Sequence, residues 1–307
     1  MFPKVCFIIV TFNGEQWIRK CLSSLGQSEV HADAIVIDNG STDGTQDIIR
    51  NDFPNVQFLQ AEQNLGFGAA NNIGIQMALE NGFDYVFLLN QDAWLIDNAL
   101  STLIQIHQKY PSFGIISPIH VNASGTALDY NFSTYLVPDK AEWFYSDLFF
   151  DKLKDIYEVE FVNAAGWLIS RDCLAKIGYF DSLFFHYCED KNYCHRLLYH
   201  GYKIGVCPTA IMVHDRGERK GVAPAFAGRR HLRHETIAKY ADVRLIDFER
   251  KYRQFIFQEL KLSVKTFLTF NFAGFKDHYS NWLFFLNLKD KIKKSRQANS
   301  RLITSNA

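Results

Sequence analysis

Proline and glycine are scarce in this sequence, with 7 Pro and 18 Gly among 307 residues. That scarcity, together with 48% hydrophobic residues, excludes a collagen-like, low-complexity or disordered chain. No uncharged apolar run reaches the roughly 18 residues of a membrane-spanning helix. The N-terminus also lacks the basic start and the small-residue cleavage site of a signal peptide. We therefore expect a folded protein that is soluble or peripheral to a membrane.

The six cysteines form no CxxC pair and are spread along the chain. Several of them lie inside apolar segments, where a free cysteine behaves as a small hydrophobic residue. This pattern predicts reduced core cysteines and a cytoplasmic protein.

Net charge is also absent, because 33 Lys and Arg balance 33 Asp and Glu. The balance conceals an asymmetry: residues 216–307 hold 20 basic and 8 acidic residues, which leaves 13 and 25 for residues 1–215. An acidic N-terminal region suits metal ions, and a basic C-terminal region suits anionic phospholipid or pyrophosphate-linked substrates. Alternatively, the two regions simply attract each other.

Short apolar runs alternate with segments of helical spacing in the first part of the chain. The runs lie at 5–10, 34–37, 56–59 and 85–89. This alternation predicts an α/β fold whose parallel sheet is covered by helices on both faces. Further strands are expected at 166–169 and 204–206, with a helix from Glu189 to Tyr199 between them.

Helical spacing replaces the strand pattern from about residue 228 to residue 290. We expect a helical C-terminal region with a frayed tail after Lys291 and an exposed apolar patch at 282–285. This region either attaches to an anionic membrane surface or packs as a cap on the catalytic domain or on a second subunit.

Polar, turn-forming residues follow three of the predicted strands, at 11–14, 38–41 and 90–92. Ligands of open α/β sheets bind beyond the carboxyl ends of the strands, so these clusters are expected to converge on one crevice. Asp38 leaves the sheet with a carboxylate that can accept from a nucleobase N–H or a ribose hydroxyl. The alternative is an Asx-turn followed by a helix cap.

The segment 64–72 opens another helix and contains Gly66 and Gly68, which permit close approach of a ligand to the backbone. It lacks the third glycine of a dinucleotide fingerprint and the GK[ST] of a P-loop. The alternative is that Gly66 only relieves a tight turn, while Asn71 and Asn72 lie on a solvated helix face.

Asp92 ends an apolar strand, and His214 follows another apolar stretch. Carboxylate oxygen and imidazole nitrogen suit Mn²⁺ or Mg²⁺ when substrate phosphates supply the remaining ligands. Each of the two residues taken singly is also compatible with a structural role.

Glu189 and Asp190 stand together at the start of a predicted helix. Adjacent helical residues point about 100° apart, so both acids can hardly face the same substrate. One of them is a candidate general base, and the other is a cap or an ion-pair partner.

Taken in order, six motifs closely resemble the family-two inverting glycosyltransferases, above all the rhamnosyltransferase-like members. They are VTFNG at 10–14, DNGSTDGT at 38–45, NLGFGAANN at 64–72, LLNQD at 88–92, GWLISRDCLAKIGYFDSLFF at 166–185 and ED at 189–190. The resemblance covers about residues 4 to 215. It implies a GT-A fold, which is a Rossmann-like, mostly parallel sheet with flanking helices, followed here by the helical region 216–307. It also implies a nucleotide-diphosphate sugar donor and a divalent cation, Mn²⁺ or Mg²⁺.

The resemblance also assigns roles to individual positions. The residues that it places at or beside the nucleotide are Thr11, Asn13, Asp38, Asn64, Gly66 and Asn71. Asp92 matches the last position of the metal motif, which reads Asp-x-Asp or Asn-Pro-Asp in the family and Asn90-Gln91-Asp92 here. His214 matches the histidine that completes the metal shell in some relatives. The second acid of the pair, Asp190, matches the catalytic base.

The resemblance implies a hexosyltransferase of bacterial surface polysaccharide synthesis, at the inner face of the cytoplasmic membrane. The expected donor is dTDP-rhamnose or a UDP-sugar, and the expected acceptor is a glycan or a lipid-linked sugar. The altered metal motif leaves open a degenerate, non-catalytic nucleotide-sugar or glycan-binding scaffold. The basic C-terminal region carries no recognisable nucleic-acid motif, so no nucleic-acid partner is expected.

Overall fold

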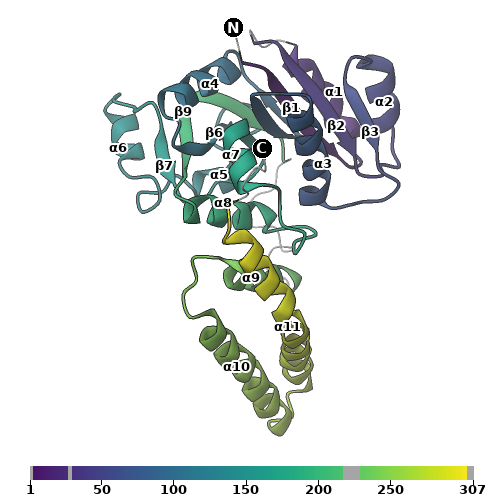
Figure 1. The fold of residues 1–307 in the computed structure, drawn as a ribbon, viewed down its shortest axis with the longest axis vertical. Helices are drawn as coiled ribbons and strands as arrows, with labels where there is room; N and C mark the ends of the chain where they lie inside the picture. Colours follow the sequence, from purple (N-terminus) through teal and green to yellow (C-terminus); the bar gives the residue numbers. More distant parts are fainter. Residues whose placement is uncertain (1–2, 27–29, 217–228, 303–307) are drawn as a thin grey trace.

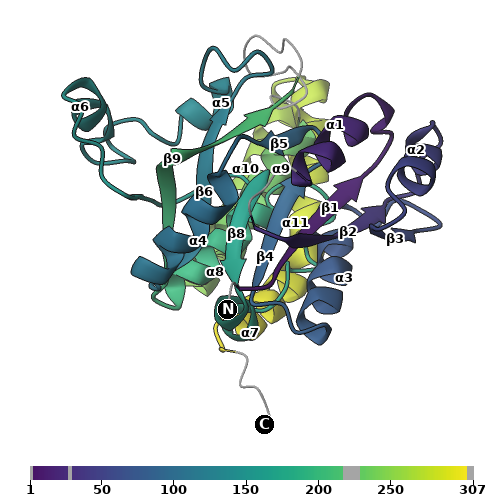
Figure 2. The same cartoon turned by 90° about the horizontal axis from the view of Figure 1, so that it is seen from above.

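The computed structural model describes residues 3–26, 30–216 and 229–302. A nine-stranded sheet with helices on both faces forms the main body, and a long helical hairpin projects from it (Figure 1). The order of the strands across the sheet is β3-β2-β1-β4-β8-β6-β9-β5 (Figure 2), and β7 pairs with β9 (Figure 1).

The first half of the chain builds four neighbouring parallel strands, as the alternating pattern predicts. They are β1 (Val5–Thr11), β2 (Ala32–Asp38), β3 (Gln57–Gln60) and β4 (Tyr85–Asn90). The helices between them are α1 (Glu15–Leu25), α2 (Thr45–Asp52) and α3 (Phe67–Glu80).

The second half of the sheet is mixed rather than parallel. Its strands are β5 (Ala93–Leu95), β6 (Phe113–Val121), β7 (Tyr157–Val159), β8 (Gly166–Ser170) and β9 (Lys203–His214). β8 runs antiparallel between β4 and β6, whereas β9 runs parallel to β6 and antiparallel to β5 and β7. The helices here are α4 (Ala99–Lys109), α5 (Tyr130–Ser133), α6 (Phe144–Phe149), α7 (Arg171–Ile177) and α8 (Glu189–Tyr199).

Hydrophobic side chains fill both faces of the sheet because successive strand residues point to opposite sides. Ile8 packs in the cluster under α3, α7 and α8, and its neighbour Ile9 packs in the cluster under α1, α2 and α4. All six cysteines are buried and unbridged, as predicted.

The C-terminal region is helical, as predicted, and consists of α9 (Arg229–Ala241), α10 (Phe248–Leu268) and α11 (Phe272–Asn299). α10 and α11 form an antiparallel hairpin in which the Tyr252 hydroxyl donates to the Phe285 carbonyl at 2.6 Å. Within the described ranges 3–26, 30–216 and 229–302, no helix combines the length and apolarity needed to cross a membrane.

One expectation for this region is wrong, and another is confirmed only in part. Residues 292–299 are helical rather than frayed, because the end of α11 docks on the main body: Ser295 donates to Asp181 at 2.6 Å, and Arg196 donates to Asn299 at 3.3 Å. Residues 303–307 of the predicted tail lie outside the described residues. The patch at 282–285 is only partly exposed, because Phe285 is buried against α10.

Candidate active site

A cavity of about 940 Å³ opens where β4 and β9 end and α8 begins. Its lining includes Asn90, Asp92, Asp190 and His214. The predicted metal residues and the predicted base therefore face one space, although they come from three distant stretches of the chain.

Strand pairing brings Asp92 and His214 together. β5 turns back directly after Asp92 and pairs with β9, so that Ala93 lies opposite His214, and the Asp215 amide donates to the Asp92 carbonyl at 2.8 Å. This pairing leaves Asp92 Oδ1 3.4 Å from His214 Nε2, while the imidazole is 2% exposed. The Asn90 amide nitrogen lies 3.5 Å from the same Nε2 atom.

The second ring nitrogen of His214, Nδ1, faces the guanidinium of Arg216. Arg216 Nε donates to His214 Nδ1 at 3.2 Å and lies 3.4 Å from Asp129 Oδ2. An Nδ1 atom that accepts this hydrogen bond places the imidazole proton on Nε2, toward Asp92. A ring nitrogen that binds a metal must carry no proton. His214 can therefore join Asp92 in holding a divalent cation only in the other tautomer, in which Nε2 carries no proton.

The set of metal ligands is small. No group of three or more His, Cys, Asp and Glu side chains able to hold a metal occurs in the described part of the chain. The carboxylate of Asp92 and the imidazole of His214 are close enough to share one cation, and the remaining ligands would have to come from a substrate diphosphate.

The two acids at the start of α8 have different surroundings. Asp190 is partly exposed and lines the cavity, whereas Glu189 is 5% exposed, and its Oε2 atom has no hydrogen-bond partner among the described residues. Two consecutive non-glycine residues with positive φ, Tyr187 and Cys188, precede the helix and turn the chain into this position.

Burial raises the pKa of both carboxyls, but Asp190 has more groups that favour its charge than Glu189 has. Burial, and then the charge of Asp190, raise the pKa of Glu189 well above its usual range. Burial also raises the pKa of Asp190, while backbone N–H donors and the Lys191 ammonium lower it. The amide of Lys191 donates to Asp190 Oδ1 at 2.7 Å. Since two adjacent carboxylates repel each other, the shared negative charge belongs on Asp190 and the proton on Glu189.

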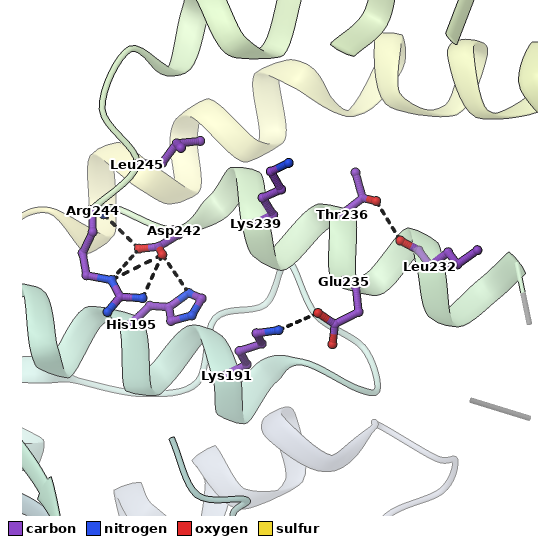
Figure 3. A pocket seen from close by; sticks show the side chains of 9 residues that line it. All are labelled: Lys191, His195, Leu232, Glu235, Thr236, Lys239, Asp242, Arg244 and Leu245. Atoms are coloured by element: carbon purple, nitrogen blue, oxygen red, sulfur yellow. Dashed lines mark hydrogen bonds and ion pairs between the residues drawn. The ribbon is translucent and has the colours of Figure 1, made fainter. Parts of the chain in front are cut away.

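The helical region completes one wall of the cavity. Glu235 of α9 lines it and pairs with Lys191 Nζ at 2.5 Å. The same ion pair borders a second cavity of about 630 Å³ between α8 and α9, where Asp242 lies 3.3 Å from His195 and also binds Arg244 (Figure 3). Burial lowers the pKa of His195 to about 4. Sequence analysis missed Glu235 because no motif marks residues after 215.

Three of the six residues predicted to meet the nucleotide, Thr11, Asn13 and Asp38, lie at the ends of β1 and β2 and are hydrogen-bonded to neighbouring loops. The Asn13 side chain accepts from the Thr42 backbone amide at 2.9 Å, and the Asn13 backbone amide donates to Ser41 Oγ at 2.9 Å. Asp38 is fully buried and accepts from the Ser41 amide at 3.0 Å and from Gln46 at 2.8 Å. Asp38 therefore has a structural role close to that of the alternative interpretation, although its bond reaches the amide three residues on rather than the two of an Asx-turn. Its contact with a nucleotide stays a prediction.

The segment 64–72 packs against protein backbone. Gly66 has φ 86°, and a Cβ there would collide with the carbonyl oxygen of Phe185. Asn64 accepts from the Gly66 amide at 2.8 Å, and Asn71 donates to the Phe67 carbonyl at 3.0 Å. Asn72 exchanges hydrogen bonds of 2.9 and 2.8 Å with the backbone of Phe180.

The solvated face suggested for this helix is therefore wrong at Asn71, which is 1% exposed. The described lining of the 940 Å³ cavity includes none of the six predicted nucleotide residues. The predicted site residues thus fall into two groups. The nucleotide residues are hydrogen-bonded to other protein groups, whereas the metal residues and the base line the cavity.

Gln91 connects the loop after β1 to the end of β4, next to Asp92. Its Oε1 atom accepts from Thr11 Oγ1 at 2.6 Å and from the Phe12 amide at 3.0 Å, and its Nε2 atom donates to the Phe12 carbonyl at 3.2 Å. A Cβ at position 14 would collide with this side chain, which explains Gly14. Sequence analysis noted Gln91 only as a departure from a motif, because its partners lie some 80 residues away.

The family model for glycosyl transferase family 2 matches residues 6–178. The chain is 26% identical over 225 residues to the low-salt glycan biosynthesis hexosyltransferase Agl10 of Haloferax volcanii, covering 70% of this chain and 68% of the relative. It is 25% identical over 239 residues to the N-acetylglucosaminyl-diphospho-decaprenol L-rhamnosyltransferase of Mycobacterium tuberculosis, covering 71% and 78%.

Solved structures share the fold at low identity. A mannosyltransferase from Pyrobaculum calidifontis in complex with GDP-Man and Mn²⁺ superposes with a TM-score of 0.57 at 17% identity, covering 78% of this chain and 64% of that one. GalNAc-T7 with UDP, GalNAc and Mn²⁺ gives 0.56 at 15%, covering 78% and 49%. These neighbours confirm the expected GT-A fold, and the matched model shows that the chain belongs to glycosyl transferase family 2.

Proposed function

We propose that this chain is an inverting glycosyltransferase that moves rhamnose or a related hexose from a nucleotide diphosphate to a glycan or lipid-linked acceptor in bacterial surface polysaccharide synthesis. The observation that carries the proposal is the shared cavity of Asp190, Asp92 and His214. Relatives named as rhamnosyltransferases and as a glycan biosynthesis hexosyltransferase support the choice of sugar and acceptor class.

The proposed reaction is a single displacement. Asp190 takes the proton of the acceptor hydroxyl while that oxygen forms a bond to the anomeric carbon. The bond from this carbon to the diphosphate breaks at the same time, so the configuration inverts and the nucleotide diphosphate leaves. A raised pKa brings Asp190 closer to the working pH, which strengthens a general base.

Asp92 and His214 would hold Mn²⁺ or Mg²⁺ together with the donor diphosphate, and the six loop residues would contact or support the nucleotide. The cation would supply positive charge to the departing diphosphate. His214 can take part only with a bare Nε2 atom, so Asp92 is the principal protein ligand in this proposal.

The first experiment is thermal unfolding of the purified protein with UDP, dTDP, GDP and their sugars, each with and without Mn²⁺ or Mg²⁺. A ligand that binds only the native state stabilises it by about 2.7 kcal/mol at about 100 times its dissociation constant. We expect a shift with one nucleotide, and a larger shift when metal is present. The absence of a shift with every nucleotide would contradict the proposed donor class.

The alternative function is a non-catalytic sugar-nucleotide or glycan-binding scaffold. The small set of metal ligands in the described residues favours it. Donor hydrolysis distinguishes the two functions, because a transferase releases nucleotide diphosphate slowly without acceptor. A scaffold would bind the nucleotide and release nothing.

We also propose a cytoplasmic location at the inner face of the membrane, where a lipid-linked acceptor would be found. The basic composition of residues 216–307 supports this location.

A further inference from the structure

The end of the α10–α11 hairpin carries large apolar side chains that face solvent. We call residues 264–276 the hairpin tip. Its most exposed apolar members are Val264 (51%), Phe267 (52%), Leu268 (69%), Phe270 (79%) and Phe272 (61%). So many neighbouring exposed phenylalanines mark an interaction surface rather than ordinary surface composition.

This apolar surface continues along the outer side of each helix. On α10, Tyr252 and Ser263 are buried against α11, whereas Phe257 is 67% exposed. On α11, Phe285 is buried against α10, whereas Tyr279 is 41% exposed.

Apolar side chains are thus exposed on both helices and on the turn between them. The hairpin tip is the free end of the projecting hairpin (Figure 1). A protein partner would cover one side of such a hairpin, whereas a lipid phase covers every side at once.

The charges around the tip identify the kind of lipid. Lys261, Lys265 and Lys276 flank the phenylalanines, and the sequence contains no acidic residue between Glu259 and Asp277. Lysine can bury its methylene chain beside an apolar surface while its ammonium reaches a polar headgroup. This arrangement complements anionic phospholipid.

We infer that the hairpin tip inserts into the interfacial region of an anionic phospholipid bilayer. The hairpin then holds the protein at the membrane surface by dipping into it. The inference concerns a surface that sequence analysis did not single out, since the patch expected at 282–285 lies further along α11. It is tested without donor or acceptor, so its outcome is independent of the proposed transfer reaction.

The test is flotation of the full chain with two kinds of vesicle, pure phosphatidylcholine and an equimolar mixture of phosphatidylcholine and phosphatidylglycerol. We expect the wild type to float with the mixed vesicles and much less with the neutral ones. Phe270→Ser and Phe272→Ser should each lower the partition coefficient about tenfold, because each removes a buried phenyl group from the lipid.

Two sets of variants separate the apolar and the charge contributions. Lys265→Gln should lower binding to the mixed vesicles about fivefold and leave binding to neutral vesicles unchanged. Phe149→Ser is the matched control, because Phe149 is 82% exposed on α6, away from the hairpin, and should leave flotation unchanged. All four substitutions are at exposed positions, so unchanged thermal unfolding confirms that each variant is folded.

Failure of the wild type to float with the mixed vesicles would overturn the inference. Flotation that Phe270→Ser and Phe272→Ser leave unchanged would overturn it as well. A dimer in sedimentation that these two substitutions dissociate, without vesicle binding, would assign the hairpin tip to a second copy of the chain instead.

Discussion

The two ends of the candidate site differ in how their polar groups are satisfied. At the ends of β1 and β2, Asp38 and Asn13 are hydrogen-bonded to neighbouring loops. At the start of α8, beside the ends of β4 and β9, Glu189 has a buried oxygen without a partner in the described residues, and burial raises the pKa of Asp190. The comparison teaches that the most motif-rich segments of this chain build a rigid frame. The sparser motifs at 90–92 and 189–190 contain the proposed metal ligand Asp92 and the proposed base Asp190.

The largest effect is expected from a substitution at Asp190. Asp190→Asn should lower the transfer rate by about 10²–10⁴-fold, because it removes the general base. Nucleotide affinity and unfolding temperature should stay near the wild-type values. Steady-state transfer assays and nucleotide titrations measure the two effects, and near-normal turnover would reject the assignment.

Asp38→Ala tests whether Asp38 stabilises the loops at the ends of β1 and β2. It should lower the free energy of unfolding by about 1–3 kcal/mol, because the buried donor of Ser41 and the partly buried donor of Gln46 lose their acceptor. Urea denaturation measures the loss. Asp33→Ala is the control, since Asp33 is exposed on the same strand, and it should be nearly neutral. If Asp38→Ala leaves stability unchanged and abolishes nucleotide binding, the frame interpretation of Asp38 is wrong.

Asp92→Ala tests the metal site. It should lower the metal-dependent part of donor affinity about tenfold or more, as expected for loss of a metal contact, while binding of nucleotide without metal stays unchanged. Titrations with and without Mn²⁺ measure the two quantities. An identical response to metal in the variant and the wild type would remove Asp92 from the shell.

Glu189→Gln tests the unpartnered acid through the pH dependence of stability. The pKa of Glu189 is raised from its usual 4.5 to about 8. Between these two pH values the native state holds a proton that the unfolded chain releases. The contribution of Glu189 to stability therefore falls as pH rises through this window, by at most about 1.4 kcal/mol per pH unit.

Glu189→Gln should remove this fall, so the variant gains stability relative to the wild type as pH rises from 4.5. The lowered pKa of His195 acts in the opposite direction, toward greater stability as pH rises above about 4, and is common to both proteins. Denaturation at several pH values measures the difference. A difference that does not depend on pH would place the Glu189 pKa near its usual value.

Local sequence pattern predicted much of the fold. The helix expected from Glu189 to Tyr199 has those bounds in the structure, and the first four strands lie where apolar runs alternate with helical spacing. Periodicity within 10 or so residues is enough for such predictions, because it is set by which face of an element is buried. It was not enough for the end of α11, whose order depends on distant contacts with Asp181 and Arg196.

The sequence by itself determined the order of the elements, the family motifs and the candidates for the site residues. Only the tertiary structure decided which residues meet. The β5–β9 register sets Asp92 beside His214, and the turn before α8 directs Asp190 into the cavity while Glu189 stays buried. The physical reason is that strand pairing, burial and the hydrogen bonds on each carboxyl depend on residues far apart in the chain, which local spacing does not encode.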